Sequence, residues 1–491
     1  MTDRIQVRVA GYNVDADLLD RFRSLLRDFA VYYEGEEIDR AGVVRSFLAM
    51  DNLTPETLCA AYARISRDPA QIGVLRNQAC HAVARARHSN QKIIFDYGHA
   101  SVAEHAVFNV DVCGISRLAT EEIESRRLIS FTEKSQRYIA MQREYVIPPE
   151  IKNTPLESEF AKFCDELFEN YVSFLPVLEK YFDSQGVKRP DLSAREDARY
   201  ILPLAAAAQF GMTANARNIE HLIRRTINHP LAELRQFAQN LKTDIEKTAP
   251  SLIKHIEEDD RKTDLFTNPL EAGAADDDVK LVYAAPEGDK TLTAALIFRS
   301  EPLSWAEARD KAGGMNEHQR KSYIAGKIEG LKAYDAMPRE YELMEFGYQL
   351  KLSASAYAQL KRHRLSTQLV KPYNPALGFT IPESIIGAGL KDRFIHCMEQ
   401  SEAVHGEIIK TAPACASYAL TNAHRRIMYL QANAREMYHI SRLRMDSSAQ
   451  WDIRNIAAKM VELAAQKAPL TMALACGKDR FEEKYREFRK K

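Results

Sequence analysis

The chain contains an internal repeat, because two stretches more than two hundred residues apart share the same motif. Each copy has Asn-Ala-Arg with a histidine four residues beyond the arginine, and each is preceded by an arginine-rich turn. The first copy has Ser125-Arg126-Arg127, Asn215-Ala216-Arg217 and His221, and the second has Arg362-His363-Arg364, Asn433-Ala434-Arg435 and His439. A repeat of this length indicates a duplicated domain rather than a solenoid array, so a functional site can be shared between unequal halves.

Size and charge agree with two domains and exclude some partners. The 491 residues, 45% hydrophobic and 28% charged, suffice for two domains of roughly two hundred residues, each with its own core. Lys and Arg number 68, as do Asp and Glu, so the net charge is zero. No overall field favours a nucleic-acid polymer or an anionic membrane. Any bound anion must be met by local arginines.

The N-terminal residues and the cysteines predict a cytoplasmic protein without a metal centre. Met1 to Arg4 lead directly into a strand-like run at Ile5 to Val9, with no apolar stretch long enough for a signal peptide or membrane span. The seven cysteines include no C-x-x-C pair, which argues against a zinc site and a disulfide framework. We expect buried free thiols.

An acidic segment rich in small residues, Glu257 to Asp278, lacks periodicity and marks the expected domain boundary. It predicts a first repeat at 1–258, a linker at 259–278 and a second repeat at 279–491. The second repeat should open with a strand at Val279 to Tyr283, followed by another at Leu292 to Phe298.

Helices should dominate both repeats. Apolar positions recur at three- and four-residue spacing from Leu231 to Ile256 and from Trp451 to Ala475, which predicts an amphipathic helix closing each repeat. The strands are few and short. Each repeat is therefore predicted to be an α+β domain, with a small, mostly antiparallel sheet packed under helices.

Glu133, Ser135 and Arg137 alternate with Lys134 and Gln136. In an extended segment the three would project from one face and offer an acceptor, a hydroxyl and a cationic fork. Such a row suits a nucleoside monophosphate. The alternative is an ordinary exposed strand face.

Arginine and histidine also recur one helical turn apart, as Arg217 with His221 and Arg435 with His439. Each pair shares a helix face and could bind a pyrophosphate or a flavin edge, although a solvated helix face is the plainer interpretation. His99 precedes Ser101 in a glycine-containing turn, where it could be a core histidine or a ligand contact.

Four motifs in order resemble the flavin-dependent thymidylate synthases. They are Tyr97 to His105, Ser125 to Tyr138, Arg199 to Pro203, and the Asn-Ala-Arg motif. That family's hallmark is Arg-His-Arg followed seven residues later by a serine in a Ser-x-Arg-Tyr context. The first repeat has this spacing, with Ser125 in place of the first arginine and Arg126 in place of the histidine. The second repeat has the Arg-His-Arg triplet intact. Arg444 to Trp451 also resembles the family's closing motif.

The resemblance implies a reaction and an assembly. Bound FAD would mediate transfer of a one-carbon unit from methylenetetrahydrofolate to C5 of dUMP, giving dTMP, with NADPH as reductant and no enzymic cysteine nucleophile. An arginine of the closing motif would stabilise the uracil ring as it loses its N3 proton. The family's pockets lie between subunits of a homotetramer, so a homodimer of tandem chains would mimic it.

Combining the two repeats gives one nearly complete pocket. Arg444 and His99 are the catalytic candidates; Glu133, Ser135, Arg137, Gln359, Arg362 and Arg199 are those for substrate; Ser101, Arg362, His363, Arg364, Asn433, Arg435, His439 and Glu133 are those for the cofactor. We expect Arg362 to Arg364 and Glu133 to Arg137 to face the same ligand.

The reciprocal combination is expected to be degenerate. Its candidates are Arg126, Arg127, Asn215, Arg217, His221 and Arg225. Pro372, which cannot donate a backbone hydrogen bond, stands in the serine's place, and Met337 in that of the histidine.

Two departures from the family pattern leave other functions open. Arg199 has its counterpart near Ser417, and Arg225 stands one residue closer to Asn215 than Arg444 does to Asn433, which on a helix rotates a side chain by about 100°. A substrate-shifted or catalytically inactive paralogue, serving as a nucleotide sensor or assembly partner, is the alternative. A nucleic-acid-binding protein is disfavoured because the arginine clusters lack interleaved aromatics.

Overall fold

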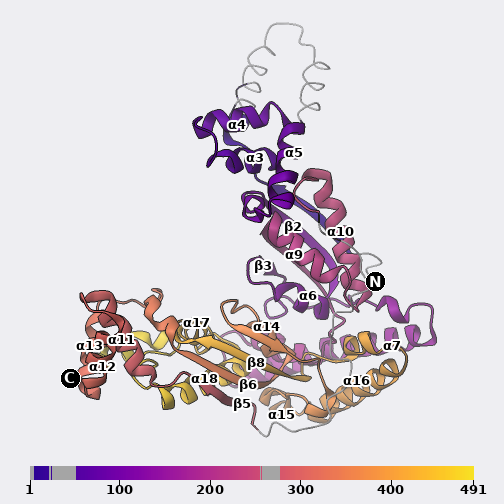
Figure 1. The fold of residues 1–491 in the computed structure, drawn as a ribbon. Helices are drawn as coiled ribbons and strands as arrows, with labels where there is room; N and C mark the ends of the chain where they lie inside the picture. The colour runs from indigo at the N-terminus through magenta and orange to yellow at the C-terminus, as the bar shows by residue number, and fades with distance from the viewer. Residues whose placement is uncertain (1–4, 21–23, 25–50, 255, 257–276, 491) are drawn as a thin grey trace, which may run out of the picture. The chain divides into compact units, whose positions relative to one another are not determined.

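The computed structural model describes residues 5–20, 24, 51–254, 256 and 277–490 (Figure 1). It divides into two compact units: a first unit of Met1–Ser135, Glu144–Asn153 and Ala205–Leu265, and a second unit of Gln136–Arg143, Thr154–Leu204 and Phe266–Lys491. The two units do not follow the repeats, since 136–143 and 154–204 of the first repeat cluster with the second. The predicted linker at 259–278 lies outside the described residues except for 277 and 278.

The first unit is built on a four-stranded antiparallel sheet with the order β1-β2-β4-β3. Its strands are β1 (Gln6–Tyr12), β2 (Val107–Ser116), β3 (Ser130–Glu133) and β4 (Ala207–Asn215). Phe108, Val110 and Val112 are buried while Asn109 and Asp111 are exposed, so one face of the sheet is apolar. Helices α6 (Arg117–Glu124), α9 (Ala216–Thr226) and α10 (Ala232–Thr248) belong to this unit (Figure 1).

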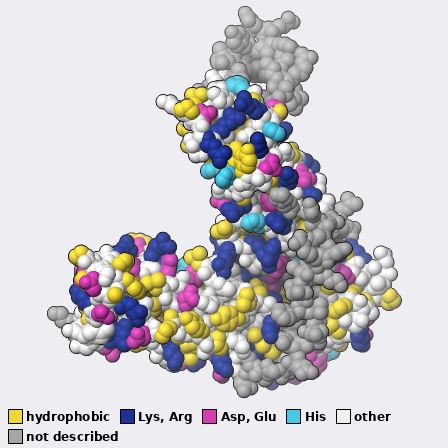
Figure 2. Space-filling view, viewed as in Figure 1, with side chains coloured by type: hydrophobic (Ala, Val, Ile, Leu, Met, Phe, Trp, Pro, Cys, Tyr) yellow, Lys and Arg dark blue, Asp and Glu magenta, His cyan; other side chains and the backbone are white. Residues whose placement is uncertain are grey.

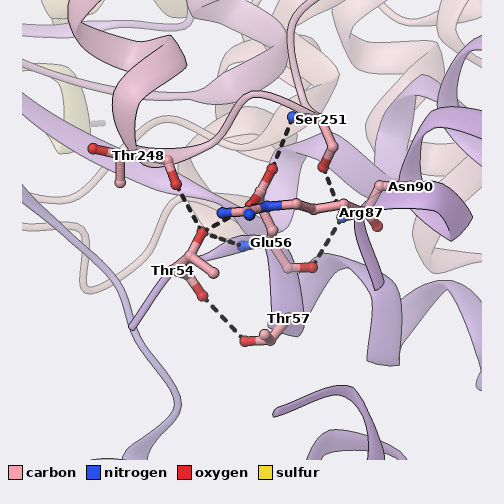
Figure 3. A network of polar contacts seen from close by, with 7 residues as sticks. All are labelled: Thr54, Glu56, Thr57, Arg87, Asn90, Thr248 and Ser251. Atoms are coloured by element: carbon pink, nitrogen blue, oxygen red, sulfur yellow. Dashed lines mark hydrogen bonds and ion pairs between the residues drawn. The ribbon is translucent and has the colours of Figure 1, made fainter. Parts of the chain in front are cut away.

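A helical layer precedes β2 in the first unit. It contains α3 (Glu56–Arg64), α4 (Ile72–Cys80), α5 (Val83–Gln91) and the short turns η1 (Lys92–Asp96) and η2 (Ala100–His105). Glu56 is fully buried and connects this layer to the end of α10 (Figure 3). Its carboxylate accepts from the Ser251 backbone N–H at 2.8 Å and from Arg87 Nε at 2.5 Å, while Thr54 donates to the Thr248 carbonyl at 2.9 Å.

The second unit repeats the sheet with the order β5-β6-β8-β7, again antiparallel. Its strands are β5 (Val279–Ala284), β6 (Glu345–Ser353), β7 (Thr367–Val370) and β8 (Arg425–Asn433), followed or flanked by α14 (Ala354–Leu360), α17 (Ala434–Arg444) and α18 (Trp451–Lys467). The identical strand order confirms the predicted duplication and the α+β class. The strands predicted at 5–9 and 279–283 are confirmed as β1 and β5, with bounds that differ by up to three residues.

The strand predicted at Leu292 to Phe298 is wrong, because these residues form the middle of helix α11 (Gly288–Ser300). The run is continuously apolar because the helix buries two of its faces, each against a different cluster. Leu292 and Leu296 pack into the core of the second sheet, whereas Ala294 and Ile297 pack against a separate cluster with Ala308. Around it lie α12 (Trp305–Gly314), α13 (Glu317–Lys327), η5 (Arg339–Leu343) and, near the C-terminus, η8 (Lys478–Arg480) and α19 (Phe481–Arg489).

Both closing helices are present but shorter than predicted. They end at Thr248 and Lys467, and in each case the next residue, Ala249 or Ala468, leaves the helical conformation. A proline follows directly, at Pro250 and Pro469. The residue before a proline is driven out of the α region, which explains both ends.

Segments of both repeats pair inside the second unit. It contains α7 (Pro155–Ser184), α8 (Pro190–Ala198) and η4 (Arg199–Ile201) of the first repeat, and η6 (Pro375–Leu377), α15 (Glu383–Gly387), α16 (Lys391–Thr411) and η7 (Pro413–Ala419) of the second. Helix α7 lies against α16, where Gln400 donates to Glu166 at 3.0 Å and Arg393 to Asn170 at 2.8 Å (Figure 1).

Two backbone hydrogen bonds relate these segments by local two-fold symmetry. Leu204 N–H donates to the Leu420 carbonyl at 2.7 Å, and Asn422 N–H donates to the Leu202 carbonyl at 3.0 Å. Leu202 and Leu420, like Leu204 and Asn422, differ by the offset that separates Asn215 from Asn433. Equivalent residues therefore exchange equivalent bonds, as at the interface of a symmetric dimer.

All seven cysteines are free, and all but Cys113 are buried, which confirms the expectation of unpaired thiols. Lys and Arg side chains are interspersed with Asp and Glu over the face drawn in Figure 2. Within the described ranges, no helix has the length and apolar character needed to cross a bilayer.

Replacing Glu56 by alanine should destabilise the first unit. Arg87 and the Ser251 amide would lose their shared acceptor, and breaking a buried ion pair from one side costs about 3 kcal/mol of unfolding free energy. Urea denaturation followed by circular dichroism measures this. The control is Lys247→Ala, which removes an exposed pair with Asp244 and should cost below about 0.5 kcal/mol. An equal loss of unfolding free energy in both variants would contradict a stabilising role for the buried contacts of Glu56.

Candidate functional site

A buried chain of three side chains lies in the second unit and contains two of the predicted site residues. Arg444, the last residue of α17, donates from Nε to His363 Nε2 at 2.9 Å. On the other side of the ring, His363 Nδ1 lies 3.3 Å from Glu436 Oε1. His363 and Glu436 are 1% and 3% exposed. Burial lowers the pKa of His363 well below its usual value, with Arg444 and His439 acting in the same direction, so the ring is neutral.

Arg444 stands in a positive environment to which both repeats contribute. Burial, together with the charges of Arg362 and Arg137, lowers its pKa to about 10, so it remains cationic at neutral pH. No carboxylate among the described residues forms an ion pair with Arg444. Arg137, from the first repeat, pairs with Glu196 at 2.6 Å and donates to the Ser448 carbonyl at 3.3 Å, within the closing motif. The second unit thus brings Arg137, Arg362 and Arg444 into one cationic cluster.

The closing motif is anchored on the first repeat's Arg199-Tyr200 segment. Gln450 donates to the Tyr200 hydroxyl at 2.7 Å, and the rings of Tyr200 and Trp451 stack 5.7 Å apart. Trp451 Nε1 donates to Asp197 at 2.8 Å, and burial raises the pKa of Asp197 to about 6. These contacts fix the loop that follows Arg444.

The remaining polar candidates of the second unit differ in exposure. Arg199 is 6% exposed, with Nε donating to the Glu196 carbonyl at 3.2 Å, and Gln359 is 8% exposed and lies 3.5 Å from Gln450. Arg362 is exposed and Arg364 half-buried. The exposed ring of His439 meets that of His363 edge-on, with centroids 5.2 Å apart.

The Asn-Ala-Arg motif has a structural role in both repeats. Asn433 caps α17, its side chain accepting from the Glu436 N–H at 2.9 Å, and Asn215 caps α9 in the same way. Arg435 pairs with Glu342 at 2.7 Å, and Arg217 pairs with Glu104. Both arginines form partly exposed ion pairs, and both asparagines commit one side-chain oxygen to the cap.

The reciprocal candidates of the first unit form no comparable chain. Arg126, at the position of His363, pairs with Glu122 on its own helix turn. Thr226 occupies the position of Arg444 and donates to the Leu222 carbonyl at 2.8 Å, while Arg225 is exposed. Arg127 lies in the turn after α6, and His221 on α9 is exposed. The one-residue displacement therefore does turn the arginine away from the buried face.

The row from Glu133 to Arg137 is not a continuous extended face, which corrects the prediction. Strand β3 ends at Glu133, Ser135 lies in irregular backbone, and Arg137 lies in a turn. In the first unit Glu133 pairs with the buried Arg117, whose pKa is raised by Glu133, Glu121 and Glu124 against the opposing effect of burial.

His99 and Ser101 are both exposed in the first unit, at the start of η2. His99 Nε2 lies 3.4 Å from Arg67 Nη2. His99 is therefore not a core histidine, and its role as a ligand contact stays a prediction.

Two buried charged residues were missed by the sequence analysis. Arg117 opens α6 directly after β2, and Glu436 stands three residues after Asn433. A carboxylate three residues after an N-cap residue is the usual capping-box partner, so the sequence pattern suggests a local cap. Instead, the side chain of Glu436 turns to His363, which only the tertiary structure reveals.

Comparison with known proteins finds the same repeat. The family model described as thymidylate synthase complementing protein matches residues 48–251 and again 280–470. A UPF0159 protein of Thermoplasma acidophilum is 25% identical over 457 residues, covering 82% of this chain and 91% of the relative. A UPF0159 protein of Chlamydia pneumoniae is 24% identical over 424 residues, covering 79% and 80%.

Single-repeat proteins are also similar. The flavin-dependent thymidylate synthase of Clostridium tetani is 31% identical over 206 residues, covering 41% of this chain and 82% of its own length. A solved UMP/dUMP methylase of Streptomyces cacaoi bound with 5-Br dUMP matches 51% of this chain and 93% of its own at 14% identity, with a TM-score of 0.33. Because the family model covers most of the chain in two copies, this protein belongs to the thymidylate synthase complementing protein family, as a tandem duplication.

Proposed function

We propose that this protein methylates a pyrimidine nucleotide at C5 in an FAD-dependent reaction, converting dUMP to dTMP with methylenetetrahydrofolate and NADPH as co-substrates. The observation that carries the proposal is the cationic cluster of Arg444, Arg362 and Arg137, drawn from both repeats. Arg444 is a largely buried cation with no ion pair to a carboxylate among the described residues, and such a cation favours an anionic ligand. A nucleotide phosphate, a flavin pyrophosphate and a uracil losing its N3 proton are all of this kind.

The residues present fit such ligands. Arg444 keeps its charge at neutral pH and has its Nε bound to His363, so its terminal nitrogens remain for a ring oxygen. A fixed cation there would stabilise negative charge as it develops on the pyrimidine. Arg137, Arg199 and Arg362 are proposed for the phosphate, Gln359 for the base, and His363, Arg364, Asn433, Arg435 and His439 for the cofactor. Bound flavin would supply the reducing equivalents and mediate one-carbon transfer.

Four candidates for the main pocket lie in the first unit: His99, Ser101, Glu133 and Ser135. Their roles stay predictions that rest on the resemblance to the synthases. We also propose that tandem chains associate as a homodimer, since one chain contains two copies of a domain whose single-repeat relatives are separate chains.

A substrate-shifted or inactive paralogue is the second candidate. Glu133, which the resemblance assigns to substrate and flavin, is paired with Arg117 within the first unit. Freeing that carboxylate would cost a buried ion pair, so its role towards a ligand would differ from the one expected. A nucleotide sensor would keep the cationic cluster without turnover.

The purified protein should take up FAD, be yellow, and form dTMP from dUMP. Arg444→Ala should lower kcat/KM by about a hundredfold or more, because removing one charge-stabilising donor costs roughly 3 kcal/mol of transition-state stabilisation. The matched control is Arg224→Ala, an exposed arginine of α9 in the first repeat, which should leave turnover unchanged. The measurements are flavin absorbance and dTMP formation.

The outcomes separate the two candidates. A colourless protein that takes up no FAD and binds no dUMP would contradict both. Binding of FAD and dUMP without dTMP formation, or failure to rescue a thymidine-requiring bacterial strain, would instead favour the inactive paralogue.

Replacing Asn433 tests whether the cap and the cofactor role can be separated. Asn433→Ala should lower the unfolding free energy by about 1 kcal/mol, whereas Asn433→Asp should keep the cap. Both should weaken FAD binding, since both remove the amide donor and the aspartate adds negative charge near the pyrophosphate. The control is Asn316→Ala, which removes an N-cap of α13 and should cost about as much stability without changing FAD affinity. Unchanged FAD affinity in Asn433→Asp would restrict Asn433 to the cap.

A further inference from the structure

Glu436 is a buried carboxylate that neither the sequence motifs nor the proposed chemistry uses. It lies on the first turn of α17, and its Oε1 atom is 3.3 Å from His363 Nδ1. Both atoms are inaccessible to solvent, and neither has another hydrogen-bond partner. The contact falls outside ideal alignment, but each atom is the available partner of the other.

The hydrogen bond from Arg444 shows where the protons lie along this chain. A guanidinium nitrogen can only donate, so His363 Nε2 must accept with its lone pair. A neutral imidazole with an accepting Nε2 carries its proton on Nδ1, which faces Glu436. In free neutral histidine the Nε2–H form predominates, so the protein selects the less common tautomer. An ionised Glu436 supplies the acceptor that makes this selection favourable.

We propose that Glu436 is a positioning residue: by holding His363 in the Nδ1–H tautomer, it fixes the guanidinium of Arg444 so that its terminal nitrogens face the pyrimidine ring. The role towards the nucleotide rests on the proposed function. The geometry of Glu436, His363 and Arg444 stands without it.

The first repeat offers a comparison within the same chain. Its corresponding positions are Arg126, Asn218 and Thr226, and none of the three can reproduce the chain of contacts. Asn218 instead donates its side-chain amide to Asn215 at 2.8 Å. The carboxylate, the imidazole and the guanidinium are thus present together in one copy and absent together from the other.

Burial and nearby charges affect the two ends of the chain formed by Glu436, His363 and Arg444. Burial raises the pKa of Glu436 to about 7, opposed by His439 and Arg435 on its own helix. Arg362, from the turn after α14, and Arg137, from the turn after β3, act on Arg444. Below about pH 7, Glu436 becomes protonated, His363 loses its anionic acceptor, and nucleotide affinity should fall.

The same shift predicts the pH dependence of stability. The carboxyl group has its ordinary pKa of 4.5 in the unfolded chain and a pKa of about 7 in the fold. Between these values the unfolded state binds fewer protons, so the unfolding free energy should fall as pH rises. Glu436→Gln, which cannot ionise, should reduce this slope. The ionised carboxylate therefore weakens the fold while it orients the site.

A ligand-free experiment tests the geometry directly. In the full chain with ¹⁵N-labelled histidine, His363, assigned by its absence from a His363→Gln variant, should show the Nδ1–H tautomer at pH 8. Glu436→Gln keeps a carbonyl acceptor and should preserve this tautomer. Glu436→Leu removes the acceptor and should shift the ring towards Nε2–H. An Nε2–H tautomer in the wild type, or an unchanged tautomer in Glu436→Leu, would overturn the proposal.

A binding experiment tests the consequence for the nucleotide. Glu436→Leu should weaken dUMP binding at pH 8 by about tenfold, the loss expected for one charge-assisted hydrogen bond. Asn218→Leu, the same change at the equivalent position of the first repeat, should leave affinity unchanged. Wild-type affinity should fall as pH decreases through 7, and Glu436→Gln should flatten that fall. Equal affinity of the wild type and Glu436→Leu would refute the role towards the nucleotide.

The two arms separate failure of this inference from failure of the proposed function. If the wild type binds neither FAD nor dUMP while His363 shows the expected tautomers, the proposed function fails and the orientation of Arg444 by Glu436 stands. If dUMP binds but His363 shows the Nε2–H tautomer, the orientation of Arg444 by Glu436 fails and the proposed function stands.

Discussion

The pair of hydrogen bonds between Leu204 and Leu420 and between Asn422 and Leu202 is the constraint on which the second unit depends. Equivalent residues of the two repeats exchange equivalent bonds, so the segments that precede β4 and β8 meet about a local two-fold axis. A symmetric homodimer achieves this with two chains. Here a single chain contains both partners, which lets α7 of the first repeat pack on α16 of the second and brings Arg137 into the unit that contains Arg444.

Covalent fusion also allows the two copies to diverge, and the structure separates what has been retained from what has changed. The serine that caps the helix after the second strand binds a carboxylate of the closing helix in both repeats, Ser116 with Glu233 and Ser353 with Asp452. These contacts maintain the scaffold. The differences gather where chemistry is proposed, as in the replacement of the chain around His363 by an ordinary local ion pair of Arg126.

Charge burial connects the scaffold to the proposed function. Arg444 is cationic in a partly desolvated site whose neighbours are also cationic, and Glu436 is ionised only above about pH 7. Both arrangements oppose folding, because a buried charge without full compensation is costly. An anionic nucleotide would relieve the repulsion. The rest of the second unit, above all the anchored closing motif, holds these groups in place in its absence.

The sequence by itself determined the duplication, the α+β class, the opening strand of each repeat and the closing helices, because these depend on local periodicity and on motifs that recur along the chain. It also predicted Arg137, Arg362, His363 and Arg444 as site residues, and the structure brings these four close together in the second unit. Tertiary structure decided which segments of the repeats share a unit, that Leu292 to Phe298 form a helix buried on two faces, and that Glu436 turns from a local cap to His363. These outcomes depend on contacts between residues far apart in the chain, and burial and pairing of charge are properties of those contacts rather than of any local pattern.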